Sequence, residues 1–145
     1  MIHGIDTDFL IAAEIRDHLF HAPAERLLDR LLANGSSLAI APQTLAEFIH
    51  VVTDPRRLRE PLSMAEAIGR AEFWWQAEEV LRVYPNDSAG SDFLVWLRDH
   101  RLGRKRLLDT LLAATYAANG IETLITNNER DFKDLSSFTI VTFRD

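Results

Sequence analysis

Hydrophobic positions in this chain fall into two alternating patterns. Short aliphatic or β-branched runs, typical of buried strands, end at polar turns and predict strands over residues 2–5, 37–41, 80–84, 123–126 and 137–143. Between them, apolar residues recur at helical spacing, in pairs of segments between the first three strands. A strand followed by a helix, repeated along the chain, predicts an α/β fold on a mainly parallel sheet. Right-handed crossovers then place helices on both faces of that sheet.

Cap signals mark where the first helices begin. A helix is predicted to follow residues 6–8, and the simplest role of Asp6 or Asp8 is to cap its N-terminus. Two further helices are predicted from about Pro23 and directly after Pro42, because proline is tolerated in the first turn of a helix.

The second half of the chain carries similar punctuation. Ser63 and Glu66 form a capping-box signature for the next helix. Residues 85–91 are predicted to form a loop and helix cap, followed by an amphipathic helix over 93–100. The last long helix ends at Asn119-Gly120, directly before a predicted strand.

Two adjacent tryptophans, Trp74 and Trp75, lie on the helix that follows the capping box. Neighbouring helical residues are about 100° apart, so both rings cannot point at the centre of one core stripe. The simpler interpretation is one core and one boundary position. The alternative is a groove that accepts a helix or peptide of a partner, where aromatic residues are favoured.

Length and composition predict a single globular domain over residues 1–145. With 47% hydrophobic and 26% charged residues, the chain can bury a sizeable core. It has no cysteine, which removes disulfides and thiolate zinc sites and favours a reducing compartment. No leader pattern and no apolar run long enough to span a membrane is present, so we expect a cytoplasmic protein without a membrane partner.

Net charge and charge placement give different indications about nucleic acid. The formal charge of -6 argues against a large nonspecific nucleic-acid surface, because affinity for phosphates comes mostly from Lys and Arg. Two local runs are nevertheless basic, one over residues 56–59 and one that ends in Arg104, Lys105 and Arg106. The second run leads directly to Asp109, so it is a candidate RNA-binding segment, although a solvated helix lead-in is the alternative.

Four carboxylates share one geometric property. Each lies at, or a helical turn from, the end of a predicted strand: Asp6, Glu47, Asp109 and Asp131. In open α/β sheets, ligands bind outside the carboxyl ends of the strands. Taken singly, Asp6 has the alternative role of a helix cap, Glu47 that of a solvated helix residue, and Asp109 that of a first-turn acid facing the helix dipole.

Gathered in one pocket, such carboxylates would repel one another unless a cation neutralised them. Mg²⁺ prefers oxygen ligands at about 2.0–2.1 Å, and divalent ions can activate a water for phosphodiester cleavage. Zinc is disfavoured by the absence of cysteine. The acids therefore predict a site for Mg²⁺ or Mn²⁺.

The order of these motifs resembles that of the PIN-domain nucleases. The resemblance rests on the strand ending in Asp6-Thr7-Asp8, the Ala-Glu47-Phe segment, Leu-Leu-Asp109 with the following Ala-Ala-Thr, and the closing TNNERDF over residues 126–132. Within that family the size and the closing motif are similar to the VapC toxins of bacterial toxin-antitoxin pairs. The resemblance spans nearly the whole chain, and its specificity lies in the combination of short motifs.

The resemblance implies an α/β/α sandwich and a Mg²⁺- or Mn²⁺-dependent endoribonuclease. Asp6, Glu47 and Asp109 match the three core acids, with Asp6 and Asp109 as metal ligands. Thr126 matches the hydroxyl residue after the fourth strand. The remaining matched positions are Thr7, Asp8, Asn128 and Asp131. Either Asn128 or Asp131 fills the fourth position, and Asp8, where relatives frequently have Asn, either faces the metal or caps the helix.

The resemblance also implies partners, namely an RNA substrate, an antitoxin protein that blocks the site, and a second copy of the chain in a homodimer. Two other classes are weighed against it. A phospho-accepting receiver domain wants an acid ending the middle strand and a lysine by the last, and the chain has neither. A catalytically weak PIN-like module that only binds protein or RNA is the alternative that keeps the fold.

Overall fold

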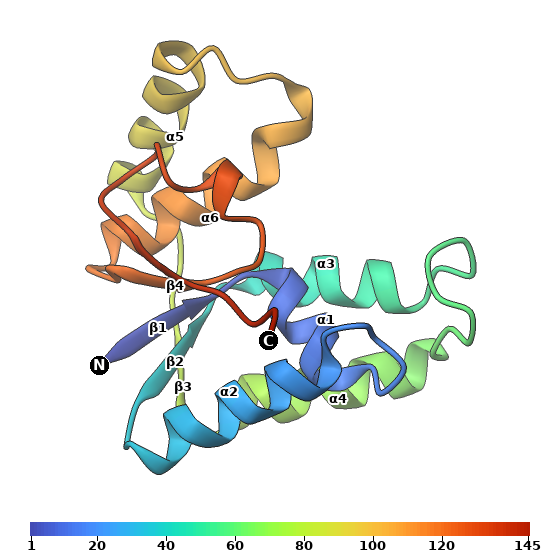
Figure 1. The fold of residues 1–145 in the computed structure, drawn as a ribbon. Coiled ribbons are helices and arrows are strands. Elements are labelled where there is room, and N and C mark those ends of the chain that lie inside the picture. The colour runs from blue at the N-terminus through green and yellow to red at the C-terminus, as the bar shows by residue number, and fades with distance from the viewer.

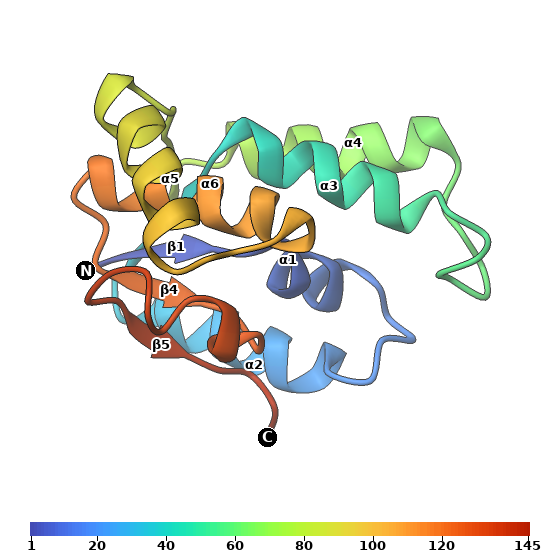
Figure 2. The same cartoon turned by 90° about the horizontal axis from the view of Figure 1, so that it is seen from above.

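The computed structural model describes residues 1–145 as one five-stranded sheet with helices on both faces (Figures 1 and 2). The strands are β1 (Ile2–Ile5), β2 (Ser37–Ile40), β3 (Val80–Arg82), β4 (Thr123–Ile125) and β5 (Thr139–Val141). The helices are α1 (Thr7–Glu14), α2 (His21–Ala33), α3 (Pro42–Val52), α4 (Met64–Gln76), α5 (Asp87–Asp99) and α6 (Leu107–Ala118), with 3-10 turns η1 (Arg104–Arg106) and η2 (Glu129–Asp131).

The sheet has the order β3-β2-β1-β4-β5, and every pairing is parallel. The predicted mainly parallel α/β sandwich is therefore confirmed. Because all strands run the same way, their carboxyl ends lie at one edge. The register places Ile5 at the end of β1 beside Ile125 of β4, so the residues that follow these two central strands are neighbours. The order of the strands also reverses direction around β1, the kind of switch point where ligands bind in open α/β sheets.

Two hydrophobic clusters lie on opposite faces of the sheet. One joins α1, α2, α3 and α4 to the sheet through side chains such as Phe9, Leu27, Phe48 and Trp74. The other packs α6 against the opposite face through Leu112, Ala113 and Tyr116, with Leu124 from β4 beneath them. Figure 1 shows α5 and α6 above the strands and α2 and α4 below them. The sheet is therefore the shared middle layer that positions both sets of helices.

A close approach between Gly4 and Tyr116 lets α6 pack tightly on β1. A Cβ built at Gly4 would lie 2.9 Å from Tyr116 Cδ2, so only glycine leaves room for the ring. The buried Tyr116 hydroxyl accepts a hydrogen bond from Ile5 N at 3.1 Å and lies within donating distance of Ile5 O (2.5 Å) and Ala39 O (3.0 Å). It thus satisfies backbone groups at the ends of β1 and β2, immediately before Asp6.

Most predicted elements are confirmed, and the boundaries differ by a few residues. The largest difference is α5, which begins at Asp87, whereas the sequence predicts a loop and cap over residues 85–91. Asn86 is the N-cap and its side chain accepts a hydrogen bond from Ala89 N at 2.8 Å. The polar stretch after Pro85 is therefore a cap and first turn rather than an extended loop, because Asn, Asp and Ser favour helix starts as strongly as turns.

The two tryptophans have different environments. Trp74 is buried in the core, and its Nε1 donates to Glu14 Oε1 at 2.9 Å, which confirms the core interpretation for this residue. Trp75 is half-buried, with the Arg82 guanidinium carbon 4.6 Å from its ring centroid and Tyr84 packed edge-on. It also borders a hollow of about 250 Å³ between α3 and α4. None of the helices is long and apolar enough to cross a membrane.

Candidate active site

Asp6 lies at the centre of the carboxyl edge of the sheet. It follows β1 directly, and its backbone N–H donates to Ile125 O at 3.1 Å, so the pairing of β1 with β4 continues to this residue. It is also the N-cap of α1, where Oδ1 accepts from Thr7 N at 2.8 Å. Burial, together with the negative charges of Asp8 and Asp109, raises the pKa of Asp6 well above its ordinary value. The capping interpretation and the site interpretation of Asp6 are therefore compatible.

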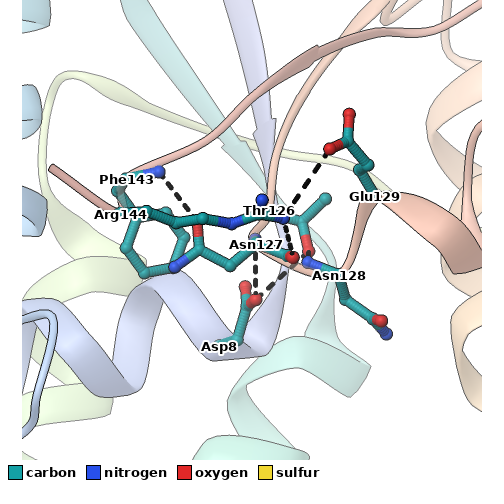
Figure 3. Close-up of polar contacts among 7 residues, drawn as sticks. All are labelled: Asp8, Thr126, Asn127, Asn128, Glu129, Phe143 and Arg144. Carbon is teal, nitrogen blue, oxygen red and sulfur yellow. Dashed lines mark hydrogen bonds and ion pairs between the residues drawn. The ribbon is translucent and has the colours of Figure 1, made fainter.

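Asp8 and Thr126 form a compact polar group beside Asp6 (Figure 3). Thr126 Oγ1 lies 2.7 Å from Asp6 Oδ2 and 3.2 Å from Asp8 Oδ2, so one hydroxyl bridges two carboxylates. Asp8 Oδ2 also accepts from Asn127 N at 2.9 Å. Burial raises the pKa of Asp8 to about 6, although these hydrogen bonds oppose the increase. Asp8 Oδ1 is buried and accepts no hydrogen bond from the protein.

Asp109 and Glu47 approach from the two helices on either side of the edge. Asp109 lies in the first turn of α6, and Glu47 lies in the middle of α3. Burial, together with the charges of Glu47, Asp131 and Asp8, raises the pKa of Asp109 to about 6. Burial also raises the pKa of Glu47, with the Thr7 side chain opposing the increase. Asp109 therefore lies near enough to Glu47, Asp131 and Asp8 to be affected by their charges, at the sheet edge where their positions in the sequence predict them.

Asn128 links Asp109 to Asp131. Its Nδ2 lies 2.6 Å from Asp131 Oδ2 and 3.3 Å from Asp109 Oδ2, so the amide donates between two carboxylates. Its backbone N–H donates to Thr126 Oγ1 at 2.9 Å, which ties this turn to the Asp6 group. Asn128 and Asp131, the two candidates for the fourth position of the family motif, therefore both lie at the site. The Asn128 amide nitrogen lies between the carboxylates of Asp109 and Asp131, where a positive charge would also be favoured.

The basic run before Asp109 divides into two environments. Arg104 and Lys105 are exposed in η1, where they are free to meet an anionic ligand. Arg106 is half-buried and faces Asp131 instead. Its Nη2 donates to the Asp131 backbone oxygen, and its Nε lies 3.5 Å from Asp131 Oδ1. Of the three side chains that the sequence groups together, only Arg106 has a hydrogen-bond or ion-pair partner within the protein.

Residues that the sequence does not single out complete the edge. Asn127 Oδ1 accepts from Phe143 N at 2.8 Å, and Arg144 Nη2 donates to Asn127 O at 2.7 Å, as Figure 3 shows. These contacts hold the segment after β5 against the turn that carries Asn128. Tyr116, described above, supports Asp6 from below. The only local signal for these roles is the Asn-rich turn itself, because each contact joins segments far apart in the chain.

The donors of the site fit a hard divalent cation. They are carboxylate and hydroxyl oxygens, the mutual repulsion of the acids is what a cation relieves, and Asp8 Oδ1 is a buried oxygen with no partner. No group of three or more carboxylates or histidines is close enough in this arrangement to enclose an ion. Mg²⁺ is compatible with that, since it usually keeps several waters and takes one or two carboxylates.

Comparison with known proteins identifies the class that this fold and acidic edge define. The PIN domain family model matches residues 5–137, from the last residue of β1 to the connection before β5, and includes Asp6, Glu47, Asp109 and Asp131. The chain belongs to the PIN domain family.

Two curated relatives are similar to it in sequence. The VapC ribonuclease Mb2897 of Mycobacterium bovis is 35% identical over 81 residues, which are 56% of this chain and 50% of the relative. The chain therefore spans about half the length of the first curated relatives it matches. Ribonuclease VapC24 of Mycobacterium tuberculosis is 26% identical over 131 residues, covering 90% of this chain and 89% of the relative.

Solved structures share the fold. VapBC2 from Rickettsia felis, whose crystal structure contains a DNA fragment from its promoter, matches with a TM-score of 0.70. The match covers 99% of this chain and 99% of that one, at 18% sequence identity. At this identity the likeness concerns the arrangement of the sheet and helices.

Proposed function

We propose that the protein is a divalent-metal-dependent endoribonuclease that acts as the toxin of a toxin-antitoxin pair. The observation that carries the proposal is the group of acids at the carboxyl edge of the sheet, where Thr126 Oγ1 lies 2.7 Å from Asp6 Oδ2 and 3.2 Å from Asp8 Oδ2, and where burial and the charges of Asp8 and Asp109 raise the pKa of Asp6. Burying like charges side by side costs folding free energy, so a cluster of buried acids indicates a functional site. Membership of the PIN domain family and the similarity to VapC ribonucleases support the same activity.

Asp6 and Asp109 are the residues that we propose hold Mg²⁺ or Mn²⁺. When bound, such an ion supplies a water of lowered pKa as the nucleophile and stabilises charge on the leaving oxygen. Thr126 keeps Asp6 oriented through the 2.7 Å hydrogen bond to Oδ2, and Thr7 N fixes the other oxygen. Both carboxylate oxygens of Asp6 are thereby locked before any ligand arrives.

Glu47 and Asp131 complete the proposed catalytic group. Burial raises the pKa of Glu47, which makes it a stronger proton acceptor than an exposed glutamate, so we propose that it accepts a proton from the attacking water. Asp131 lies at the outer side of Asp109, linked through the Asn128 amide. Asp8 and Asn128 serve as supporting residues, since each connects a carboxylate of the site to the turn after β4.

The RNA backbone is proposed to lie along η1, where the exposed Arg104 and Lys105 are the phosphate contacts, whereas the half-buried Arg106, which the sequence groups with them, faces Asp131. Exposed cations provide affinity for phosphates without reading sequence. This placement brings a scissile phosphate from the basic turn towards the acidic edge. A net charge of -6 keeps nonspecific binding elsewhere on the surface weak.

The proposal extends to partners and place. We propose a cognate antitoxin and a homodimer, with Trp75 as the tryptophan available to a partner because Trp74 is buried. The VapBC2 structure with promoter DNA supports an antitoxin partner by analogy. Residues 1–145 are proposed to work as one nuclease domain in the cytoplasm. Two cores sharing one sheet support the single domain.

A direct test uses single-stranded or looped RNA with the purified protein. We expect cleavage with Mg²⁺ or Mn²⁺ and none with EDTA, and a melting temperature that rises with Mn²⁺, since a ligand bound only by the native state stabilises it. Undiminished cleavage in EDTA would refute the metal-dependent mechanism. A melting temperature indifferent to Mn²⁺, together with RNA binding but no cleavage, would favour the catalytically weak binding module instead.

A further inference from the structure

The basic run contains one residue whose side chain turns inward to the acidic edge. Arg106 is the N-cap of α6, and its backbone oxygen accepts from Thr110 Oγ1 at 2.6 Å, so the position of its main chain is set by the helix that carries Asp109. Its guanidinium contacts both the backbone oxygen and the carboxylate of Asp131. One side chain therefore joins the start of α6 to η2.

Backbone hydrogen bonds and the buried Phe132 anchor the turn that carries Asp131, and Arg106, the N-cap of α6, contacts Asp131 itself. The turn from Asn128 to Asp131 is a single 3-10 turn whose residues are exposed or half-buried, and its side-chain contact to the site runs through the exposed Asn128 amide. Figure 3 shows the Asn128 side chain projecting away from Asp8 and Arg144, so the polar group around Asn127 does not hold it. The Arg106 guanidinium donates one hydrogen bond, from Nη2 to the Asp131 backbone oxygen, and its Nε lies at ion-pair distance, 3.5 Å, from the Asp131 carboxylate.

We propose that Arg106 is a positioning residue for Asp131 rather than a contact to the RNA backbone. By holding η2 against α6, it keeps Asp131 and, through Asn128, Asp109 in the arrangement that receives the divalent ion. This inference rests on the proposed function. It separates Arg106 from Arg104 and Lys105, which stay exposed for phosphates.

The proposal and simple electrostatics predict opposite changes in Mn²⁺ affinity when Arg106 is replaced. Removing a cation beside a cluster of carboxylates should by charge alone tighten the binding of another cation. If Arg106 positions Asp131, Arg106→Gln should instead weaken Mn²⁺ binding, by about tenfold or more, the usual effect of losing a group that orients a metal site. Arg106→Lys keeps the charge but lacks the guanidinium, so it should weaken Mn²⁺ binding as well.

Calorimetric titration of the full chain with Mn²⁺ alone measures this directly. Arg130→Gln is the matched control, because Arg130 lies in the same 3-10 turn, is exposed and has no ion pair, so it removes the same charge without touching Asp131. The variants are first compared by thermal melting in EDTA to show that they fold. In an Asp131→Asn background, Arg106→Gln should change the Mn²⁺ dissociation constant by a smaller factor than in the parent, because the carboxylate partner is gone and only the contact to the backbone oxygen remains to be lost.

RNA cleavage kinetics supply the second readout. Arg106→Gln should lower kcat and leave KM for RNA near the parental value, whereas Arg104→Gln with Lys105→Gln should raise KM. If Arg106→Gln raises KM and leaves kcat and Mn²⁺ affinity unchanged, Arg106 is an RNA contact and the positioning role is overturned. That role is equally overturned if Arg106→Gln and Arg106→Lys both bind Mn²⁺ as the parent does. A parent protein that neither binds Mn²⁺ nor cleaves RNA would refute the proposed function, and this inference with it.

Discussion

Thr126 Oγ1 lies 2.7 Å from Asp6 Oδ2 and joins the turn after β4 to the residue after β1. Because the hydrogen bond favours the charged carboxylate, it opposes the burial that raises the pKa of Asp6. The same hydroxyl accepts a hydrogen bond from Asn128 N at 2.9 Å, so it couples Asp6 to the turn that carries Asp131. Both functions need a hydroxyl at position 126.

Thr126→Val therefore tests the bridge. The substitution keeps the shape but leaves buried carboxylate oxygen and a backbone N–H without this partner, at a cost of about 1–3 kcal/mol in the free energy of unfolding. Mn²⁺ affinity near neutral pH should also fall, because Asp6 is easier to protonate. Thr126→Ser retains the hydroxyl and is the control for both measurements. Chemical denaturation and Mn²⁺ titration in which Val and Ser behave alike would show that the hydroxyl is dispensable.

The close approach of Gly4 to Tyr116 predicts that alanine substitutions at Gly4 and at Gly69 change stability in opposite directions. Gly4→Ala places a methyl 2.9 Å from the Tyr116 ring and should destabilise the fold by about 1–3 kcal/mol. Gly69→Ala in α4 has open space around its Cβ position and should be neutral or stabilising, by about 0.5–1 kcal/mol. Denaturant midpoints of the two variants measure the contrast. Equal midpoints for both would mean that the close approach does not limit position 4.

Acidic pKa values near 6 predict how stability changes with pH. Burial raises the pKa of Asp109 and of Asp8 from the ordinary 3.8 to about 6, so the folded state binds protons that the unfolded state has released. Their contribution to stability is fully present below about pH 4 and is lost as the pH rises through 6. Thermal melting in EDTA should therefore show this loss between pH 4 and 7. A melting temperature in EDTA that rises steadily across that interval would contradict the raised pKa values.

Mn²⁺ should reverse the trend, because it binds the deprotonated acids. Its affinity is expected to rise from pH 5 to 7 and to level off above that, with protons released on binding near pH 6. Calorimetry in buffers of different ionisation enthalpy measures the released protons directly. Proton release near zero at pH 6 would mean that Asp109 and Asp8 are already ionised before the metal arrives.

Exposure of Arg104 and Lys105 predicts a salt effect. Replacing both with Gln should weaken RNA binding and reduce the slope of log affinity against log salt by about 0.7 for each phosphate of a single strand that is no longer neutralised. Filter binding in EDTA, where no cleavage occurs, isolates this step. Replacing Arg56 and Arg57, in the other basic run, is the matched control. An unchanged slope in the Arg104/Lys105 variant would assign the run to the solvated surface.

Local sequence patterns are sufficient to predict most helices and strands and the edge of the sheet where the acids lie. The short aliphatic and β-branched runs predict all five strands. Asp6 follows the end of a strand and Asp109 lies in the first turn of a helix, and these placements predict that both lie at the carboxyl edge of the sheet. The start of α5 is missed because Asn86 and its polar neighbours fit a turn as well as a cap. Amphipathic periodicity indicates the long helices, whose boundaries depend on single residues.

The contacts within the site are beyond local pattern. Arg106 with Asp131, Thr126 with Asp6 and Tyr116 with Ile5 each join segments separated by many residues, and one of them divides a run of three cations that looks uniform in sequence. Such partners depend on strand order and helix packing. The sequence identifies the acids, but the groups that hold them become visible only in the folded chain.

The most direct measurement of the central claim is made on Asp109→Asn. If Asp109 holds the divalent ion, the variant should lose Mn²⁺ affinity and RNA cleavage, while its melting temperature in EDTA stays equal to the parent's or rises, since a member of a repelling acidic group has gone. If Asp109 instead serves only the dipole of α6, the variant should cleave RNA at the parental rate and melt lower, reflecting a loss of about 0.3–1 kcal/mol. Parental cleavage with a lowered melting temperature in EDTA would contradict the assignment of this site.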